Sequence, residues 1–171
     1  ICRTSGVWHA GRTMQPSGPG FGARSRAFER ASAPLVLETI AAITDDQLAR
    51  LDALITVSCT HASSPGLELT LLGRRAIRRS VDRWHLGFMG CSAGRAGLRL
   101  AHAAAASRPR ALVTTCELSS LHYQYSEDLD QLTANALFAD GAASVLLGPE
   151  PAAARILAAT SVALPEAADQ M

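Results

Sequence analysis

Short apolar runs separated by longer segments with helical spacing form the main pattern of this chain. Residues 53–57 (Ala-Leu-Ile-Thr-Val) make one such run, and residues 111–116 and 143–147 make two more. Each run has the length of a strand and contains β-branched residues, which pack well on a pleated sheet. A run that is apolar throughout is typical of a strand covered on both faces. Strands that alternate with helices predict an α/β fold with a mostly parallel or mixed sheet.

Two segments have clear helical signals. The first follows Pro34 and places apolar residues on one helix face: Leu35, Leu37, Ile40, Ala41 and Ile43. Thr44 and Gln47 have the spacing of a capping box, so a short turn of helix is expected before Leu51. The second helix is predicted from Ser92 to about Ala106, and its first turns are rich in Gly and Ala, which allow close packing.

The beginning and end of the chain predict a division into two parts. Residues 10–25 are rich in Gly, Ser and Pro, so we expect an irregular N-terminal segment over residues 1–34, with Pro34 starting or interrupting the helix that follows. Residues 35–171 form the expected folded domain. The chain starts at Ile1 rather than Met and ends at Met171 without a closing element, which predicts a domain truncated at its C-terminal end.

One cysteine lies between small residues at a predicted strand-to-helix junction, in the run Gly87–Gly94 (GFMGCSAG). A helix N-terminus favours a thiolate, because unpaired backbone N–H groups and the helix dipole stabilise negative charge. Cys91 is therefore the candidate nucleophile, held at the floor of an internal cavity. The alternative is a small buried core residue, which cysteine commonly is.

Composition and charge exclude several other classes. A formal net charge of +1 gives no reason to expect a nucleic-acid or anionic membrane partner. The arginines between residues 74 and 83 are interpreted as a solvated face. The four cysteines form no C-x-x-C pair, so neither a metal site nor a disulfide framework is indicated, and a reducing cytoplasm is expected. No stretch approaches the roughly 18 apolar residues of a membrane span.

Several motifs, in order, resemble one enzyme family. The segments are Gly90-Cys91-Ser92-Ala93-Gly94, residues 116–124 (CELSSLHYQ) and residues 136–143 (ALFADGAA), preceded by Val57-Ser58-Cys59-Thr60 and Ser64-Pro65-Gly66. Together they resemble the type III polyketide synthases of the chalcone and stilbene synthase family. The resemblance covers most of residues 35–171 and is weaker before them.

The resemblance implies a fold, an activity and a set of site residues. The fold would be the thiolase-like, layered αβαβα arrangement of two similar halves, of which this chain holds most of the first. Cys91 would take a starter acyl group from an acyl-CoA, and Phe138 would gate the cavity in which malonyl-CoA is decarboxylated. Thr60, Ser119 and His122 would line the acyl cavity and the dimer interface. No metal or other cofactor is implied, and the complete protein would be a homodimer.

Departures from the family pattern affect the expected activity. Ala139 stands where many members have Gly, Arg95 replaces a small residue, and Ser64 lacks the bulk that some members place at the subunit boundary. These changes concern cavity size and the choice of starter. The family's catalytic His and Asn lie in its second half. We therefore expect the isolated chain to make no polyketide, because loss of one oxyanion donor alone costs about 10²–10³ in rate.

Three alternatives use the same residues differently. The run around Cys91 also fits the G-x-S-x-G elbow of α/β-hydrolases, with Ser92 as nucleophile, but Glu117 and His122 lie too close together in sequence to complete a triad. An initiating ketoacyl-carrier-protein synthase would share the fold and the nucleophilic cysteine. A truncated, non-catalytic product is the third alternative.

Overall fold

A four-stranded sheet forms the centre of the molecule in the computed structural model, which describes residues 19–167. The strands are β1 (Ala53–Val57), β2 (Asp82–Leu86), β3 (Ala111–Leu118) and β4 (Asp140–Leu147), in the order β2-β1-β3-β4. β1 pairs in parallel with β2 and β3, whereas β4 is antiparallel to β3. The mixed α/β sheet expected from the sequence is confirmed.

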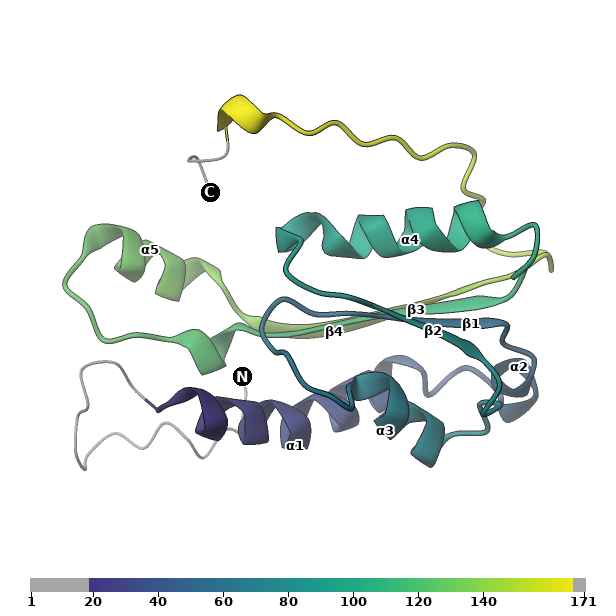
Figure 1. Ribbon diagram of the computed structural model, residues 1–171, viewed down its shortest axis with the longest axis horizontal. Helices are drawn as coiled ribbons and strands as arrows, with labels where there is room; N and C mark the ends of the chain where they lie inside the picture. Colours follow the sequence, from purple (N-terminus) through teal and green to yellow (C-terminus); the bar gives the residue numbers. More distant parts are fainter. Residues whose placement is uncertain (1–18, 168–171) are drawn as a thin grey trace.

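Helices cover both faces of this sheet. In Figure 1, α1 (Phe21–Thr39) and α3 (Leu67–Arg74) lie on one face, and α4 (Ala93–Ala104) lies on the other. α2 (Asp45–Ala49) lies between α1 and β1 in the chain, and α5 (Leu129–Leu137) lies between β3 and β4. Short 3₁₀ turns occupy Gly90–Ser92, Ser119–His122 and Pro165–Ala167.

The alternation of side chains along β1 divides the core into two clusters. Leu54 faces the α1 and α3 side, where it joins Phe28 and Leu71. Ile55 and Val57 face the α4 side. All five residues of β1 are buried, as expected for a central strand covered by helices on both faces.

The first helix differs from the prediction. α1 begins at Phe21 and continues through Pro34, so the irregular segment predicted over residues 1–34 is wrong for residues 21–34, and residues 1–18 lie outside the described part of the chain. Phe28 before the proline and Val36 after it are buried in the same core. Burial on one continuous face outweighs the backbone hydrogen bond that proline cannot donate.

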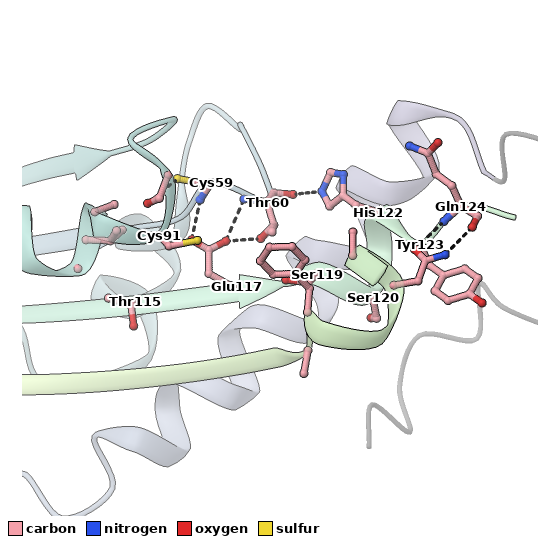
Figure 2. Close-up of a pocket in the computed structure, with 18 of the residues that line it drawn as sticks. Cys59, Thr60, Cys91, Thr115, Glu117, Ser119, Ser120, His122, Tyr123 and Gln124 are labelled. Carbon is pink, nitrogen blue, oxygen red and sulfur yellow. Dashed lines mark hydrogen bonds between the residues drawn. The ribbon is translucent and has the colours of Figure 1, made fainter. Parts of the chain in front are cut away.

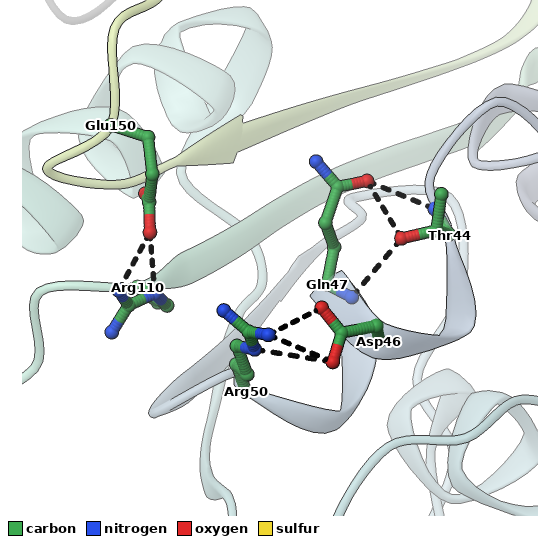
Figure 3. Close-up of polar contacts among 6 residues, drawn as sticks. All are labelled: Thr44, Asp46, Gln47, Arg50, Arg110 and Glu150. Atoms are coloured by element: carbon green, nitrogen blue, oxygen red, sulfur yellow. Dashed lines mark hydrogen bonds and ion pairs between the residues drawn. The ribbon is translucent and has the colours of Figure 1, made fainter.

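Polar contacts at the ends of the elements match the sequence in part. The capping box is present: the Thr44 hydroxyl accepts from the Gln47 N–H at 3.2 Å, and the Gln47 side chain accepts from the Thr44 N–H at 3.0 Å (Figure 3). β4 begins at Asp140, three residues before the predicted run 143–147. α3, β2 and α5 were not predicted from the sequence.

The arginines between residues 74 and 83 are not all solvated. Arg75 lies against the end of α1, where its guanidinium donates to the Ile43 carbonyl at 2.8 Å and to Asp45 Oδ1 at 3.1 Å. Arg78 donates to the Leu51 carbonyl at 2.6 Å. Arg75 thus ties the end of α3 to the connection between α1 and α2, and Arg78 ties the segment after α3 to the residues before β1.

The register of the parallel strands fixes where a site can form. Val57 lies opposite Leu86 on one side and Thr115 on the other. The segments that follow β1, β2 and β3 therefore all lie at the end of the sheet where these strands have their carboxyl ends. α4 begins at the same end. In parallel α/β sheets, ligands bind outside the carboxyl ends of the strands.

Candidate functional site

A cavity of about 780 Å³ opens at the carboxyl ends of β1 and β3, beside the start of α4. The five residues selected from the sequence all line it: Cys91, Phe138, Thr60, Ser119 and His122. Most of them are labelled in Figure 2, which shows side chains from the β1 loop, the end of β3 and the segment after it converging on one space. The structure thus brings together residues that are up to 78 positions apart in the sequence.

Cys91 lies in the 3₁₀ turn Gly90–Ser92, directly before α4. The chain reverses here with two residues in the left-handed region, Phe88 at φ 56° and Gly90 at φ 66°. Glycine adopts this conformation without strain, whereas phenylalanine does not. Cys91 is exposed, so the expectation of an internal cavity floor is wrong. Burial begins only at Ala93, and the 3₁₀ turn leaves the thiol on the cavity wall.

The neighbouring serine has a different role. Ser92 Oγ donates to the Met89 carbonyl at 3.2 Å, and Ser92 is not among the residues that line the cavity. Its hydroxyl stabilises the turn before α4. Nothing in this geometry supports Ser92 as the nucleophile of a hydrolase.

Glu117 organises the loop after β1. Its Oε1 accepts from the Cys59 N–H at 2.8 Å, and its Oε2 accepts from the Thr60 N–H at 3.0 Å and the Thr60 hydroxyl at 2.7 Å (Figure 2). Hydrogen bonds to an ionised acceptor are the stronger class. Both carboxylate oxygens are therefore committed to holding Cys59 and Thr60 in the cavity wall.

Thr60 connects this loop to the segment after β3. Its hydroxyl accepts from the Leu118 N–H at 3.0 Å, and its carbonyl lies 2.7 Å from His122 Nε2. A carbonyl oxygen can only accept, so His122 Nε2 carries a proton. His122 is the only histidine among residues 19–167 that lines the cavity. The other three in that range, His61, His85 and His102, do not.

The three described cysteines lie in different environments. Cys59 lines the cavity, and its thiol donates to the Gly90 carbonyl at 3.7 Å. Cys116, the last residue of the predicted strand 111–116, is fully buried, and burial, with Glu117 and Asp140 nearby, raises its pKa to about 12. The side chain of Cys59 thus shares the cavity with Cys91.

The far wall of the cavity is built by α5 and the loop before it. Asp128 caps the helix by accepting from the Gln131 N–H at 3.0 Å. Asn135 Nδ2 donates to the Gln124 carbonyl at 2.7 Å and so connects α5 to the segment after β3. Phe138 follows the helix and is 59% exposed. The ring lies on the cavity wall and not in the core.

Within residues 19–167, no group of three or more His, Cys, Asp or Glu side chains is arranged to hold a metal ion. No helix in that range is long and apolar enough to cross a membrane.

Sequence reasoning missed several lining residues: Cys59, Thr115, Gln124, Gln131 and Asn135. For Cys59 and Thr115 a signal existed, because each lies at or just after the carboxyl end of a predicted parallel strand. For Gln131 and Asn135 the available signal was Asp128 three residues before Gln131, which is the spacing of a helix N-cap and marks the start of α5.

Comparison with known proteins identifies relatives of this arrangement. A sequence model described as chalcone and stilbene synthases, N-terminal domain, matches residues 42–151. The chain is 31% identical to 1,3,6,8-tetrahydroxynaphthalene synthase from Streptomyces coelicolor over 158 aligned residues. The alignment covers 88% of this chain and 42% of that protein.

Solved structures agree with the sequence match. The crystal structure of 1,3,6,8-tetrahydroxynaphthalene synthase from Streptomyces coelicolor A3(2), a bacterial type III polyketide synthase, superposes with a TM-score of 0.71 at 32% identity, over 78% of this chain and 40% of that one. CsyB complexed with CoA-SH gives a TM-score of 0.64 at 25% identity, over 81% and 41%. The chain thus spans about two fifths of the relatives it matches.

Proposed function

Because this chain belongs to the chalcone and stilbene synthase family of type III polyketide synthases, we propose that Cys91 accepts an acyl group from an acyl-CoA thioester. Its α/β unit with four strands matches the first part of the thiolase-like structures of that family. The observation that carries the proposal is the position of Cys91, which is exposed on the wall of a cavity of about 780 Å³ at the start of a helix.

The proposed reaction has two steps, which are acyl transfer to Cys91 and condensation with malonyl-CoA. The Cys91 thiolate attacks the thioester carbonyl of acyl-CoA, a tetrahedral oxyanion forms, and the CoA thiolate leaves and takes up a proton. Malonyl-CoA then loses CO₂, and the enolate that remains attacks the acyl-Cys91 carbonyl. The new carbon–carbon bond forms as the Cys91 thiolate is released, and the product is a β-ketoacyl-CoA.

The other selected residues would shape and bound the acyl site. Phe138 would gate the cavity from the end of α5, on the far wall from Cys91. Thr60, Ser119 and His122 would line the cavity near the thiol, and Glu117 would hold Thr60 in place. The relative CsyB is complexed with CoA-SH, which supports CoA thioesters as the substrate class.

The condensation would require residues outside this domain. The family resemblance implies a His and an Asn from the second half, which would supply a base and oxyanion donors to the thioester carbonyl. It also implies a homodimer for the complete protein. The acyl transfer to Cys91 is therefore proposed for this chain, and the full condensation for the complete protein.

Intact-protein mass spectrometry after incubation with acetyl-CoA and longer acyl-CoA thioesters tests the proposal. We expect a single acyl adduct that peptide mapping places on Cys91 and that Cys91→Ala removes. Cys59→Ala is the matched control, because Cys59 lines the same cavity, and it should keep the adduct. Absence of any acyl adduct, when iodoacetamide still alkylates Cys91, would refute the proposal for this chain.

The extender unit, either malonyl-CoA or malonyl-carrier protein, distinguishes a polyketide synthase from an initiating ketoacyl-carrier-protein synthase. The match to the chalcone and stilbene synthase model decides against a hydrolase at the level of family. If the complete protein condensed malonyl-carrier protein and ignored malonyl-CoA, the initiating ketoacyl-carrier-protein synthase would replace the polyketide synthase. If Cys91 took no acyl group, the non-catalytic alternative would hold.

A further inference from the structure

A second, much smaller cavity lies behind the loop that carries Cys59 and Thr60. Its volume is about 20 Å³, which is enough for one water molecule, since about 10–15 Å³ on this measure holds one. Its walls come from α1, the end of β1, the loop after it, the start of α3 and the edge strand β2. The residues with polar side chains on these walls are Thr56, Ser58, His61, Ser63 and His85.

His61 is the buried residue on these walls that has an unpartnered polar atom. Its side chain is only 8% exposed, and its ring stacks on Phe28 with centroids 4.4 Å apart and an interplanar angle of 24°. Nδ1 faces the Ser25 hydroxyl at 3.5 Å, the outer limit of a hydrogen bond. Nε2 has no hydrogen-bond partner among residues 19–167. Buried polar atoms of this kind are normally bonded to protein or to ordered water.

The cavity offers the other partners that a water molecule needs. His85, whose Nδ1 bonds the Thr56 hydroxyl at 2.9 Å, is a second imidazole that lines the cavity. Ser58 and Ser63 also line the cavity. The Ser58 hydroxyl already lies 3.4 Å from the Thr60 hydroxyl and donates to Glu117 Oε2 at 3.5 Å, so towards the water it can act only as an acceptor. A buried water typically makes two to four hydrogen bonds, and this set of groups can provide them.

We propose that this cavity binds one structural water molecule, which bridges His61 Nε2 and the edge strand and makes His61 a positioning residue for the wall of the larger cavity. The loop is then held from two sides. Glu117 and His122 hold Cys59 and Thr60 at the front. His61, the next residue, holds the loop at the back through Phe28 and the water.

The water site does not depend on the acyl chemistry of Cys91. It rests on the volume of the cavity, on the buried Nε2 of His61 that has no hydrogen-bond partner among residues 19–167, and on the polar residues of the walls. Its failure would therefore leave the proposed function intact, and failure of acyl transfer would leave the water site intact.

A crystal structure of the chain provides the first test. We expect one electron-density peak within hydrogen-bond distance of His61 Nε2, and we expect His61→Phe, which keeps the aromatic stack on Phe28, to lose that peak. His102→Phe on the exposed side of α4 is the matched control and should keep it. A dry cavity in the wild-type chain, or a direct protein partner for Nε2, would overturn the proposal.

The positioning role has its own readout in the rate at which Cys59 is alkylated. His61→Phe is expected to raise that rate several-fold, since the loop loses its bridge to β2, whereas His102→Phe should leave it unchanged. An unchanged rate in His61→Phe contradicts the positioning role.

If His61→Phe does not fold, the wild-type chain still decides the question of the water. Magnetisation transfer between the His61 imidazole and a slowly exchanging water supports it. Its absence, when the imidazole resonances of His61 are resolved, refutes it.

Discussion

Cys91, in the turn before α4, and Cys116, in β3, both carry a thiol, but the environments of the two thiols are opposite. Cys91 is exposed on the cavity wall, whereas Cys116 is fully buried with a pKa raised to about 12 by desolvation and by the nearby carboxylates of Glu117 and Asp140. The thiolate is the reactive form. At neutral pH, Cys116 is therefore an inert part of the core.

Thiol reactivity follows from this contrast. Iodoacetamide at about pH 8, near the usual thiol pKa, should alkylate Cys91 first, Cys59 more slowly and Cys116 only after unfolding. Peptide-resolved mass spectrometry over time measures the order, and Cys91→Ser should remove the fast phase. Fast labelling of Cys116 in the folded chain would contradict the burial of its thiol.

The carboxylate of Glu117 gives a second prediction at this scale. Glu117→Gln keeps the shape but replaces one acceptor oxygen by an NH₂ group, which then faces the N–H of Cys59 or of Thr60. A buried donor left without an acceptor costs about 1–3 kcal/mol, so we expect the free energy of unfolding to fall by that amount in urea titrations. Glu127→Gln, at an exposed loop position, is the control. Equal stabilities of the two variants would rule out the organising role.

His61 makes stability depend on pH. Burial is the main cause that lowers its pKa below 6.5, Glu29 partly opposes it, and His85 and His122 act in the same direction as burial. As the pH falls below about 6.5, the unfolded state takes up the proton before the folded state does, so stability decreases. Urea unfolding between about pH 7.5 and 5.5 should show this loss, and His61→Phe should reduce it. An identical pH dependence in both proteins would exclude His61 as its source.

At the scale of elements, the small residues of α4 set its distance from the sheet. A Cβ added at Gly97 would lie 3.0 Å from a methyl group of Val113 and 3.3 Å from one of Val57. Both partners belong to the buried core of the α4 face. The glycine lets the helix approach, and this closeness places the start of α4 at the cavity.

Two alanine substitutions separate packing from helix propensity. Gly73, near the end of α3, has nothing within 4 Å of its added Cβ, so Gly73→Ala should raise stability by about 0.5–1 kcal/mol. Gly97→Ala gains the same propensity but overpacks the core, which costs about 1–3 kcal/mol, so its net effect should be zero or negative. Thermal and urea unfolding measure both. If Gly97→Ala stabilised the protein as much as Gly73→Ala, the side chains of Val113 and Val57 would have to move aside without cost, and the packing argument would be wrong.

At the scale of the molecule, the chain spans about two fifths of its relatives and exposes several large apolar side chains. They lie on α5 and the segment after β4 as well as before Cys91, and include Phe88, Leu129, Leu137, Leu157 and Val162. Exposed apolar surface on this scale marks interaction sites or association. The domain therefore has surface that is suited to contact with further protein.

The isolated chain is expected to associate and to make no polyketide. Sedimentation velocity at increasing concentration should show self-association, and incubation with acyl-CoA and malonyl-CoA should release no CO₂, because the family's His and Asn lie in its second half. A monodisperse monomer with cooperative melting would contradict the first expectation. Turnover of malonyl-CoA that Cys91→Ala abolishes would contradict the second.

The sequence alone predicted the three short apolar strands, the capping box and the helix after Cys91, because each depends on local periodicity or spacing. It also selected five residues that line one cavity, through motifs that resemble the family. It did not predict α3, β2 or α5. It was wrong about residues 21–34, because Pro34 is tolerated in a helix whose buried face continues on both sides of it.

Tertiary structure alone decided the positions that depend on contacts between distant segments. The parallel register of β1 and β3 brought Cys59 and Thr60 to Glu117, 57 residues or more away. The 3₁₀ turn left Cys91 on the cavity wall. Local sequence determines which elements form, because helix and strand periodicity is a property of a few neighbouring residues. Burial, hydrogen-bond partners and the distance between two side chains depend on how the elements pack, and they were settled only in the folded chain.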